Sequence, residues 1–584
     1  MLARLALVTA LFSQAYAEGK TKNLVIIHTN DLHSQIEGSG PDAMVTPEID
    51  DDPVKGHFAR LSYKIKSLRA EALEQGMGVI LVDAGDFYSG SMFHTLGPNP
   101  TTREIPEMEF FHDMGYDAIT LGNHEFDAGI QGLTTMLNKA KSRNMSLPLV
   151  ATNIVLPPGS PLGAFTSEKG NQSVFMTKCI EKIVKTAGGD VRVAILGALG
   201  PDGAMVSKLR REGTSFIGMN DLSGAIEIDA LVNSIQKQVT EARENGADVV
   251  ILLLHGGSPE DTALAGGVRG LDVIISGHTH QRYLKKVGAT ILSQAGYFGR
   301  YLGRLTLHVS KTSAPVKDRS GHFEMDDRTP MDPTYLKVIE RQKDAVIGTV
   351  TSFPYHASAG RWAYPLVKAY NQPYGIQTIA MSAVRSALGK YLPNRLDVYF
   401  SFDGLIRAGY PNLSGEPYPY QFSDIFRVLS LGQTPSGTWG NQPVQFFLTK
   451  QDVRDLITFT AEQRIHNKSY GISLSSDITY RQYGEKDSLA LFDFRLRGES
   501  FEKWPDLLSL ATNIYAYGYL GELYNRRGRT FVTRNKNGDL APVAQILAPP
   551  EAELWMEALR DQGQVETGIS ADDSNNSSKR SEKK

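Results

Sequence analysis

Six short runs of apolar residues, each followed by a polar turn, constrain the fold of this chain more than any other feature. The runs are Leu24–Ile27, Val79–Val82, Asp117–Leu121, Val193–Leu196, Val249–Leu254 and Leu271–Ile275. Continuous apolar character is typical of strands that are buried on both faces. Amphipathic stretches separate the runs, and in Asp229–Asn245 apolar residues recur every three to four positions before Gly246. This alternation, from Leu24 to about Val309, predicts an α/β layered domain.

The length, net charge and cysteine count of the chain bear on its domain number, its partners and the kinds of site that it can form. A length of 584 residues predicts two large domains or three to four small ones. The balance of 61 basic against 64 acidic residues gives a net charge of −3 and argues against nucleic acid or an anionic membrane as the main partner. The single cysteine, Cys179, excludes an intramolecular disulfide and a cysteine-based zinc site.

The N-terminus, residues 1–17, predicts a cleaved export signal. Arg4 supplies a positive charge, Leu5–Phe12 is apolar, and Ala15-Tyr16-Ala17 fits the small-x-small cleavage pattern. This apolar run is shorter than the ~20 residues that a membrane span needs. We therefore expect a secreted or periplasmic protein without a membrane span.

The amino-acid composition of the chain changes after the first predicted domain. We expect that domain over residues 18–312, followed by a linker with a short helix over residues 313–345. Residues 346–566 are rich in aromatic residues, proline and glycine, with a strand at 397–400 and a helix around 452–459, and predict a smaller α+β domain. The polar residues 567–584 predict a disordered tail.

Five of the turns that follow the apolar runs carry residue types that bind metal ions. They are Asn30-Asp31-Leu32-His33, Gly85-Asp86, Gly122-Asn123-His124-Glu125-Phe126-Asp127, His255-Gly256-Gly257 and Gly277-His278-Thr279-His280. In open α/β sheets, sites gather beyond the carboxyl ends of the strands. Two divalent cations ~3.5–4 Å apart can activate a water and offset the charge of a phosphate ester, using oxygen and imidazole ligands. Together the turns predict a binuclear metal site.

These turns resemble, in order and spacing, those of the calcineurin-like metallophosphoesterases, and within them the 5′-nucleotidase / UDP-sugar hydrolase group. His28-Thr29-Asn30-Asp31 and Gly122–Asp127 have the forms of that group, and Gln294-Ala295-Gly296 with Leu302-Gly303-Arg304 is similar to its closing strands. The resemblance covers about Leu24 to Val309. It implies a four-layer β-sandwich flanked by helices, with a smaller α+β C-terminal domain that binds the nucleoside.

The resemblance also implies a set of site residues. The first metal would be held by Asp31, His33, Asp86 and His280. The second metal would be held by Asp86, Asn123, His255 and His278, so that Asp86 bridges the two. His124 would stabilise charge or act as a general acid beside the scissile phosphate, with Asp127 orienting it. The group often has Gln or Asn at the position of His280, so a stronger nitrogen ligand is expected here.

The second domain departs further from the group. Phe402–Arg407 lies where the group has Asn-Gly-Gly-Gly-Ile-Arg, and only Gly404, Ile406 and Arg407 agree. Arg407 is the candidate for a phosphate or carboxylate contact, since a guanidinium binds such groups through two parallel hydrogen bonds. Arg385 is a weaker candidate, and Tyr515 would either stack on a base or pack in the core.

We therefore expect an exported phosphohydrolase with two divalent ions (zinc, manganese or magnesium) that acts on nucleoside 5′-phosphates or UDP-sugar-like diphosphates. One alternative keeps the site and changes the substrate to a cyclic nucleotide or another phospho- or sulfo-ester. A second alternative is a non-catalytic exported protein that binds nucleotides. That alternative predicts lost ligands, whereas all seven ligand positions are filled.

Overall fold

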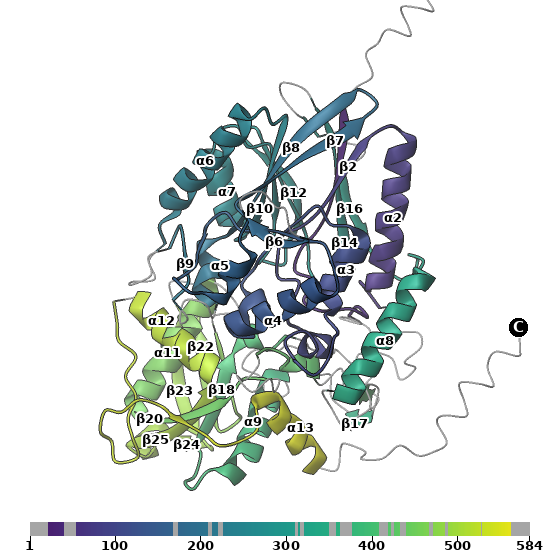
Figure 1. Cartoon of the computed structure of the whole chain (residues 1–584). Coiled ribbons are helices and arrows are strands. Elements are labelled where there is room, and N and C mark those ends of the chain that lie inside the picture. Colours follow the sequence, from purple (N-terminus) through teal and green to yellow (C-terminus); the bar gives the residue numbers. More distant parts are fainter. Residues whose placement is uncertain are drawn as a thin grey trace, which may run out of the picture. The chain divides into compact units, whose positions relative to one another are not determined.

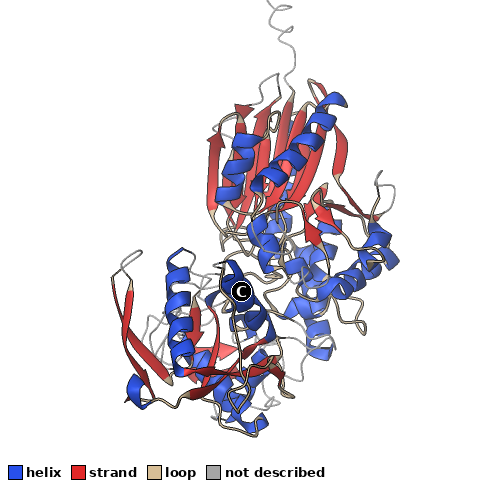
Figure 2. Ribbon diagram, turned by 90° about the vertical axis from the view of Figure 1, so that its left-hand side faces the viewer, coloured by secondary structure: helices blue, strands red, loops and turns tan. Residues whose placement is uncertain are grey.

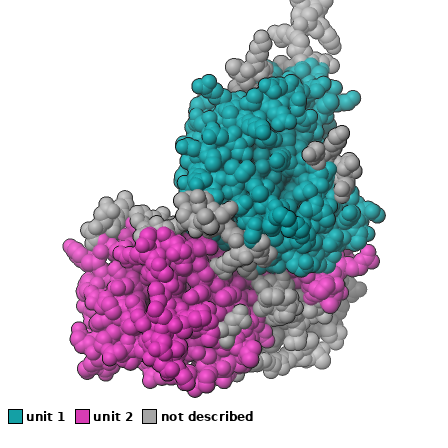
Figure 3. All heavy atoms as spheres, turned by 60° about the vertical axis from the view of Figure 1, so that its left-hand side comes forward, with its two compact units in different colours: residues 1–38, 55–88, 105–338 teal, residues 39–54, 89–104, 339–584 magenta. Residues whose placement is uncertain are grey.

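The computed structural model describes residues 22–39, 54–167, 173–207, 213–219, 226–309, 314–315, 320–349, 358–362, 376–407, 418–421, 426–432, 440–466, 471–484, 489–526 and 528–561. The chain forms two compact units, coloured separately in Figure 3. Unit 1 comprises residues 1–38, 55–88 and 105–338, and unit 2 comprises residues 39–54, 89–104 and 339–584. The predicted export signal (1–17) and polar tail (567–584) lie outside the described residues.

Unit 1 is built on two sheets (Figure 1). The first sheet has the order β15-β14-β1-β2-β3-β4-β6, with β16 also paired to β14. Its strands are β1 (Asn23–Thr29), β2 (Gly78–Asp83), β3 (Ala118–Thr120), β4 (Leu147–Val150), β6 (Val174–Thr177), β14 (Tyr301–His308), β15 (Ala314–Pro315) and β16 (Gly321–Glu324). Strands β1, β2, β3, β4 and β6 run parallel, whereas β14 runs antiparallel to β1.

The second sheet of unit 1 has the order β12-β13-β11-β10-β8-β7. Its strands are β7 (Cys179–Thr186), β8 (Gly189–Leu199), β10 (Val249–His255), β11 (Val273–Ser276), β12 (Arg282–Val287) and β13 (Thr290–Ala295). Strands β8, β10, β11 and β13 are parallel, and β7 and β12 are antiparallel edge strands.

The core of unit 1 explains why its strands are continuously apolar. On β10, Ile251 and Leu253 belong to the cluster that fills the space between the two sheets. The alternate residues Val250, Leu252 and Leu254 belong to a second cluster on the other face of the sheet. Both faces of the strand are therefore buried, as its sequence predicts.

Helices cover the outer faces of both sheets and complete the layers. The second sheet is covered by α6 (Ile228–Glu244) and α7 (Ser258–Gly267), which Figure 2 shows lying across its strands. The first sheet is covered by α2 (Phe58–Glu74), α3 (Pro106–Met114) and α4 (Gly129–Ser142). The short helix α5 (Pro201–Val206) follows β8. The predicted layered α/β fold is confirmed, and all six apolar runs are strands.

Unit 2 contains a sheet with the order β21-β18-β25-β20-β26, together with smaller sheets and several helices. The strands of this sheet are β18 (Val398–Phe402), β20 (Pro443–Thr449), β21 (Ile472–Leu474), β25 (Leu507–Asn513) and β26 (Ala544–Gln545). The smaller sheets contain β17 (Ser358–Trp362), β19 (Tyr418–Gln421), β22 (Ile478–Tyr483), β23 (Ala490–Leu496) and β24 (Glu499–Ser500). The helices include α9 (Ile376–Leu388), α11 (Lys450–His466), α12 (Ile514–Arg526) and α13 (Glu551–Asp561).

The helix expected in the linker lies within α8 (Pro333–Thr349). Among the described helices, none is both long enough and apolar enough to cross a membrane.

Candidate metal centre

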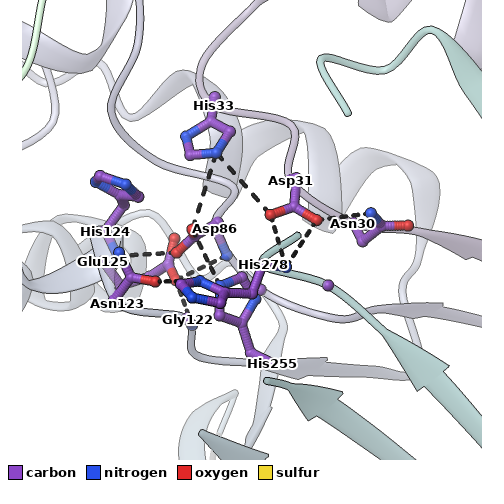
Figure 4. Close-up of polar contacts among 12 residues, drawn as sticks. Asn30, Asp31, His33, Asp86, Gly122, Asn123, His124, Glu125, His255 and His278 are labelled. Atoms are coloured by element: carbon purple, nitrogen blue, oxygen red, sulfur yellow. Dashed lines mark hydrogen bonds and ion pairs between the residues drawn. The ribbon is translucent and has the colours of Figure 1, made fainter. Parts of the chain in front are cut away.

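The predicted ligands come together at the carboxyl ends of the strands of unit 1. Asp31 and His33 follow β1, Asp86 follows β2, and Asn123 follows β3. From the second sheet, His255 is the last residue of β10, and His278 and His280 follow β11. Figure 4 shows Asp31, His33, Asp86 and His278 pointing toward one another. Residues as far apart in the sequence as His33 and His280, 247 positions, therefore belong to one cluster.

The ligands predicted for the first metal converge on one point. The Nε2 atoms of His33 and His280 lie 3.0 Å apart, and Asp31 Oδ1 lies 3.5 Å from His280 Nε2. Asp86 Oδ2 lies 3.8 Å from His33 Nε2. Potential ligand atoms of Asp31, His33 and His280 all lie within 4.8 Å of one another.

The ligands predicted for the second metal converge beside them. Asp86 Oδ2 lies 3.0 Å from His255 Nε2, and Asn123 Oδ1 lies 3.0 Å from His278 Nδ1. Asp86, His255 and His278 again offer ligand atoms within 4.8 Å of one another. Asp86 contacts ligands of both sets, which is the position required of a bridging carboxylate.

The pKa shifts of the clustered carboxylates and imidazoles are compatible with a site that binds a cation. Burial raises the pKa of Asp31 to about 6. Burial would also raise the pKa of Asp86, but the imidazoles around it, His255 foremost, hold it well below its usual range. Although burial lowers it, the pKa of His255 is raised to about 10, chiefly by the charge of Asp86. Buried oxygen and imidazole groups crowded in this way suit zinc, manganese or magnesium, so the residues fit a divalent metal centre.

The backbone of the ligand loops adopts a conformation that side chains rarely tolerate. The ligand residues with positive φ are Asp31 (50°), His33 (49°), Asp86 (54°), His278 (76°) and His280 (57°). Such a conformation costs of order 1–3 kcal/mol per residue and persists only where the surrounding structure imposes it. Strain of this kind gathers at functional sites.

Asn30 and the backbone of His278 fix the orientation of Asp31. Asn30 donates from its side-chain amide to Asp31 Oδ2 at 2.7 Å and to the Gly296 carbonyl at 2.7 Å. The Asn30 side-chain oxygen accepts from the Ala295 N–H at 2.8 Å. The backbone N–H of His278 also donates to Asp31, at 3.0 Å. Asp31 is therefore oriented from both sheets.

Glu125 ties together the loops that follow β2 and β3. Its Oε2 accepts from the N–H of Gly122 at 2.5 Å and of Asp86 at 3.0 Å, and its Oε1 accepts from Tyr88 at 3.0 Å (Figure 4). A Cβ at Gly122 would collide with Asp86 Oδ1, so the two loops approach this closely only with glycine there. Glu125 thus holds in place the loop that carries Asp86, the carboxylate predicted to bridge the two metals.

His124 and Asp127 form the predicted pair beside the ligands. His124 Nδ1 lies 2.8 Å from Asp127 Oδ2, and the His124 N–H donates to Asp86 Oδ1 at 2.8 Å. The His124 ring centroid lies 5.0 Å from that of His33. The pair has the geometry of an imidazole oriented by a carboxylate next to a metal centre.

Two supporting residues were not predicted as part of the site. Gln294 on β13 accepts from the Gln281 N–H at 2.5 Å and donates to the Gly277 carbonyl at 2.7 Å, which braces the loop of His278. Asp202 Oδ2 lies 3.2 Å from His278 Nε2. A signal for Asp202 was present, because Gly200-Pro201-Asp202-Gly203 is a further turn with glycine and an acidic residue directly after a strand.

The predicted substrate-binding residues all lie in unit 2. Gly404 lies in the turn after β18, and Arg407 Nη1 donates to the Gly404 carbonyl at 3.3 Å. Arg385 on α9 pairs with Asp477 at 2.7 Å, and Tyr515 is the second residue of α12. Their roles in substrate binding stay predictions.

Comparison with known proteins matches this chain to a phosphoesterase family over the residues that carry the candidate ligands. Residues 24–282 match the family model described as calcineurin-like phosphoesterase, and this stretch contains all seven predicted ligand positions. The 5′-nucleotidase of Rattus norvegicus is 30% identical over 264 residues, which make up 45% of this chain and 38% of the rat protein. The chain thus spans well under two thirds of the length of this relative.

Solved structures match nearly the whole chain in fold. A 5′-nucleotidase precursor from Thermus thermophilus superposes with a TM-score of 0.69 and 18% identity, covering 94% of this chain and 98% of that one. The sulfate thiohydrolase SoxB of Thermus thermophilus gives a TM-score of 0.62 and 17% identity, covering 94% and 96%. At these identities the likeness concerns the fold alone.

Proposed function

We propose that this chain, in which residues 24–282 form a calcineurin-like phosphoesterase domain, is an exported binuclear-metal phosphohydrolase. The observation that carries the proposal is the position of Asp86, which contacts His33 of one ligand set and His255 of the other. A single metal site would not need a carboxylate shared in this way. Export is supported by the composition of residues 1–17.

Seven of the predicted residues would hold the two cations, and His124 with Asp127 would act on the substrate. Asp31, His33, Asp86 and His280 would hold one divalent ion, and Asp86, Asn123, His255 and His278 would hold the other. When bound, the ions supply a nucleophile at neutral pH and positive charge at the phosphoryl oxygens. Zinc, manganese and magnesium all suit these ligands.

His124 acts on the reacting group itself. Its Nδ1 is engaged by Asp127 Oδ2, so Nε2 is the ring nitrogen that can face a substrate. A proton held at Nε2 stabilises negative charge that develops on the phosphoryl group, or passes to the leaving oxygen. Asp127 keeps the imidazole oriented.

The proposed substrates are nucleoside 5′-phosphates or nucleotide diphosphate compounds. The similarity of residues 24–282 to 5′-nucleotidases supports this choice. The departure from the 5′-nucleotidase pattern in Phe402–Arg407 favours a second candidate, a different phospho- or sulfo-ester on the same site. The likeness in fold to a sulfate thiohydrolase is compatible with that second candidate.

Metal analysis combined with a substrate panel tests the proposal. The purified protein should contain two divalent ions per chain and release phosphate from AMP, ATP or UDP-glucose when Mn²⁺ or Zn²⁺ is supplied. Asp86→Asn should abolish hydrolysis and reduce the bound metal while the circular dichroism spectrum stays unchanged. Asp229→Asn, an exposed aspartate in the first turn of α6, is the matched control and should behave as wild type. Turnover that survives Asp86→Asn would rule out the metal assignment.

A further inference from the structure

The turn after β8 brings a carboxylate to the far side of a predicted metal ligand. Asp202 is the second residue of α5, and its Oδ2 lies 3.2 Å from His278 Nε2. Both side chains are largely shielded from water, with 27% of the Asp202 side chain and 15% of the His278 side chain exposed. Asp202 lies 76 residues before His278 in the sequence, so only the fold brings them together.

The contact determines which nitrogen of His278 can bind a cation. A neutral imidazole carries one N–H and one lone pair, and an ionised carboxylate can only accept a hydrogen bond. Of the two oxygens that face this ring, Asp202 Oδ2 at Nε2 and Asn123 Oδ1 at Nδ1, the carboxylate is the stronger acceptor, so Asp202 favours the proton of His278 on Nε2. The lone pair is then on Nδ1, the atom that lies 3.0 Å from Asn123 Oδ1 and faces the other ligands of the second metal.

His255 is held in the same manner by a different acceptor. Its Nδ1 lies 2.9 Å from the Ala84 carbonyl, which leaves Nε2 facing Asp86. Both imidazoles predicted for the second metal thus have their outer nitrogen fixed by an oxygen. For His278 that oxygen belongs to a side chain and can be changed by mutation.

The protein holds Asp202 in place through a second acidic residue. Glu260, in the first turn of α7, accepts from the Asp202 N–H at 2.8 Å. The neighbouring Gly200 donates its N–H to the His255 carbonyl at 2.8 Å. A Cβ at Gly200 or at Gly256 would collide with Glu260 Oε2, so the turn can pack here only because both positions are glycine. The turn that carries Asp202 is thereby fastened to the end of β10, where His255 lies.

We propose that Asp202 is a positioning residue for the second metal: it sets the tautomer and orientation of His278 without binding the cation. The inference rests on the proposed function, because it requires the predicted ligand set. Carboxylates that accept from the outer nitrogen of a ligand histidine typically change metal affinity by about 10–100-fold.

Metal titration of the metal-free protein tests this inference without relying on turnover. Asp202→Ala should weaken binding of the second Mn²⁺ or Zn²⁺ equivalent by about 10–100-fold in calorimetry and leave the first equivalent unchanged. Asp202→Asn should lose less, since its side-chain oxygen can still accept from Nε2. Asp229→Asn, the same change in the first turn of α6, should titrate as wild type.

A second measurement separates positioning from a purely structural role. In ¹⁵N-histidine-labelled, metal-free protein, the His278 signals, assigned with a His278→Gln variant, should show an Nε2–H tautomer that Asp202→Ala converts to a mixture. A structural role alone would lower the melting temperature and leave the tautomer unchanged.

The outcomes distinguish this inference from the proposed function. If the wild type binds no second equivalent, the proposed function fails. If the wild type binds two equivalents, and Asp202→Ala binds both with wild-type affinity and keeps the Nε2–H tautomer, only the role of Asp202 is overturned. Should Asp202→Ala fail to fold, Asp202→Leu, which cannot accept a hydrogen bond, carries both measurements. Wild-type affinity with an unchanged tautomer in that variant overturns the proposal.

Discussion

Strand ends in the two units place buried polar side chains in the same topological position, yet the surroundings of these side chains differ. In unit 1, Asp86 lies just beyond the parallel strand β2, and imidazoles and a second carboxylate surround it. In unit 2, Asp403 lies just beyond β18, and it is bound by Arg464 Nε at 2.6 Å and by the Ser473 hydroxyl. Asp403 has a complete set of partners within the protein.

Asn513, at the end of β25, repeats the pattern of unit 2. It donates to Glu551 Oε2 at 2.9 Å and to Ser401 Oγ at 3.1 Å. Buried polar groups are normally satisfied in this way. The cluster around Asp86 instead collects potential ligands that face one another, such as the Nε2 atoms of His33 and His280 at 3.0 Å, an arrangement that a cation would stabilise. A polar residue after a strand therefore indicates a metal site only when its neighbours are further potential ligands, rather than hydrogen-bond partners that satisfy it.

The strongest test of this contrast compares matched aspartates. Asp86→Asn should remove activity and leave the fold, whereas Asp403→Asn should leave metal content unchanged and lower the free energy of unfolding. Removing one partner of a buried ion pair typically costs about 3–5 kcal/mol. Metal content and urea unfolding of both variants measure the two effects. An Asp403→Asn protein that lost metal while its free energy of unfolding stayed unchanged would contradict the structural role of Asp403.

His124→Ala should lower kcat by about 10²- to 10⁴-fold, the usual contribution of a positioned acid or base. Because His124 is not among the predicted ligands, metal content should not change. Asp127→Asn should have a smaller effect, since the imidazole remains and loses only its orienting carboxylate. Steady-state kinetics with parallel metal analysis checks both variants, and a loss of metal in His124→Ala would instead make His124 a ligand.

A third case lies within unit 1, away from the ligands, where the buried His28 and the half-buried His322 share one hydroxyl group. Ser293 Oγ lies 2.9 Å from His28 Nε2 and 3.1 Å from His322 Nε2. Burial, with a smaller contribution from Arg282, lowers the pKa of His322 to about 4. Burial also lowers the pKa of His28 well below its usual value. Both imidazoles are therefore neutral in the folded protein.

The expected pH dependence follows from those lowered values. The unfolded chain takes up a proton at each of these histidines below about pH 6.5, whereas the folded chain resists protonation. The contribution of these two histidines to the free energy of unfolding should be fully present above about pH 6.5. It should decrease as the pH falls toward about 4, by roughly 3 kcal/mol at most for His322. Urea unfolding of the metal-free protein measures this slope. In His322→Asn the slope should be shallower, and an unchanged slope would contradict the assignment.

The ligands could be predicted from sequence because each is a local event, a ligand residue directly after an apolar strand. Asp31, Asp86 and His255 needed no knowledge of distant contacts. Asp202 has the same local signature, but its partner His278 lies on another strand, so its role follows only from the fold. The pairing of Asp403 with Arg464, 61 residues away, is equally invisible in the sequence.

The fold itself was predictable where strands are buried on both faces, as on β10. It was less predictable at the sheet edges. Residues of β12 alternate between exposed and half-buried, and this two-residue period in a polar segment gave no apolar run to recognise. In unit 2 the order β21-β18-β25-β20-β26 departs from the order in the sequence, and no single sequence pattern predicted this topology.

The left-handed backbone at five ligand positions bears on whether the chain still works as an enzyme. Glycine adopts such a conformation without steric cost, so exchanging any of these side chains for glycine would make folding easier. Asp31, His33, Asp86, His278 and His280 all keep their side chains. The chain therefore retains, at positions where glycine would cost less, the five side chains that the proposed metal centre requires.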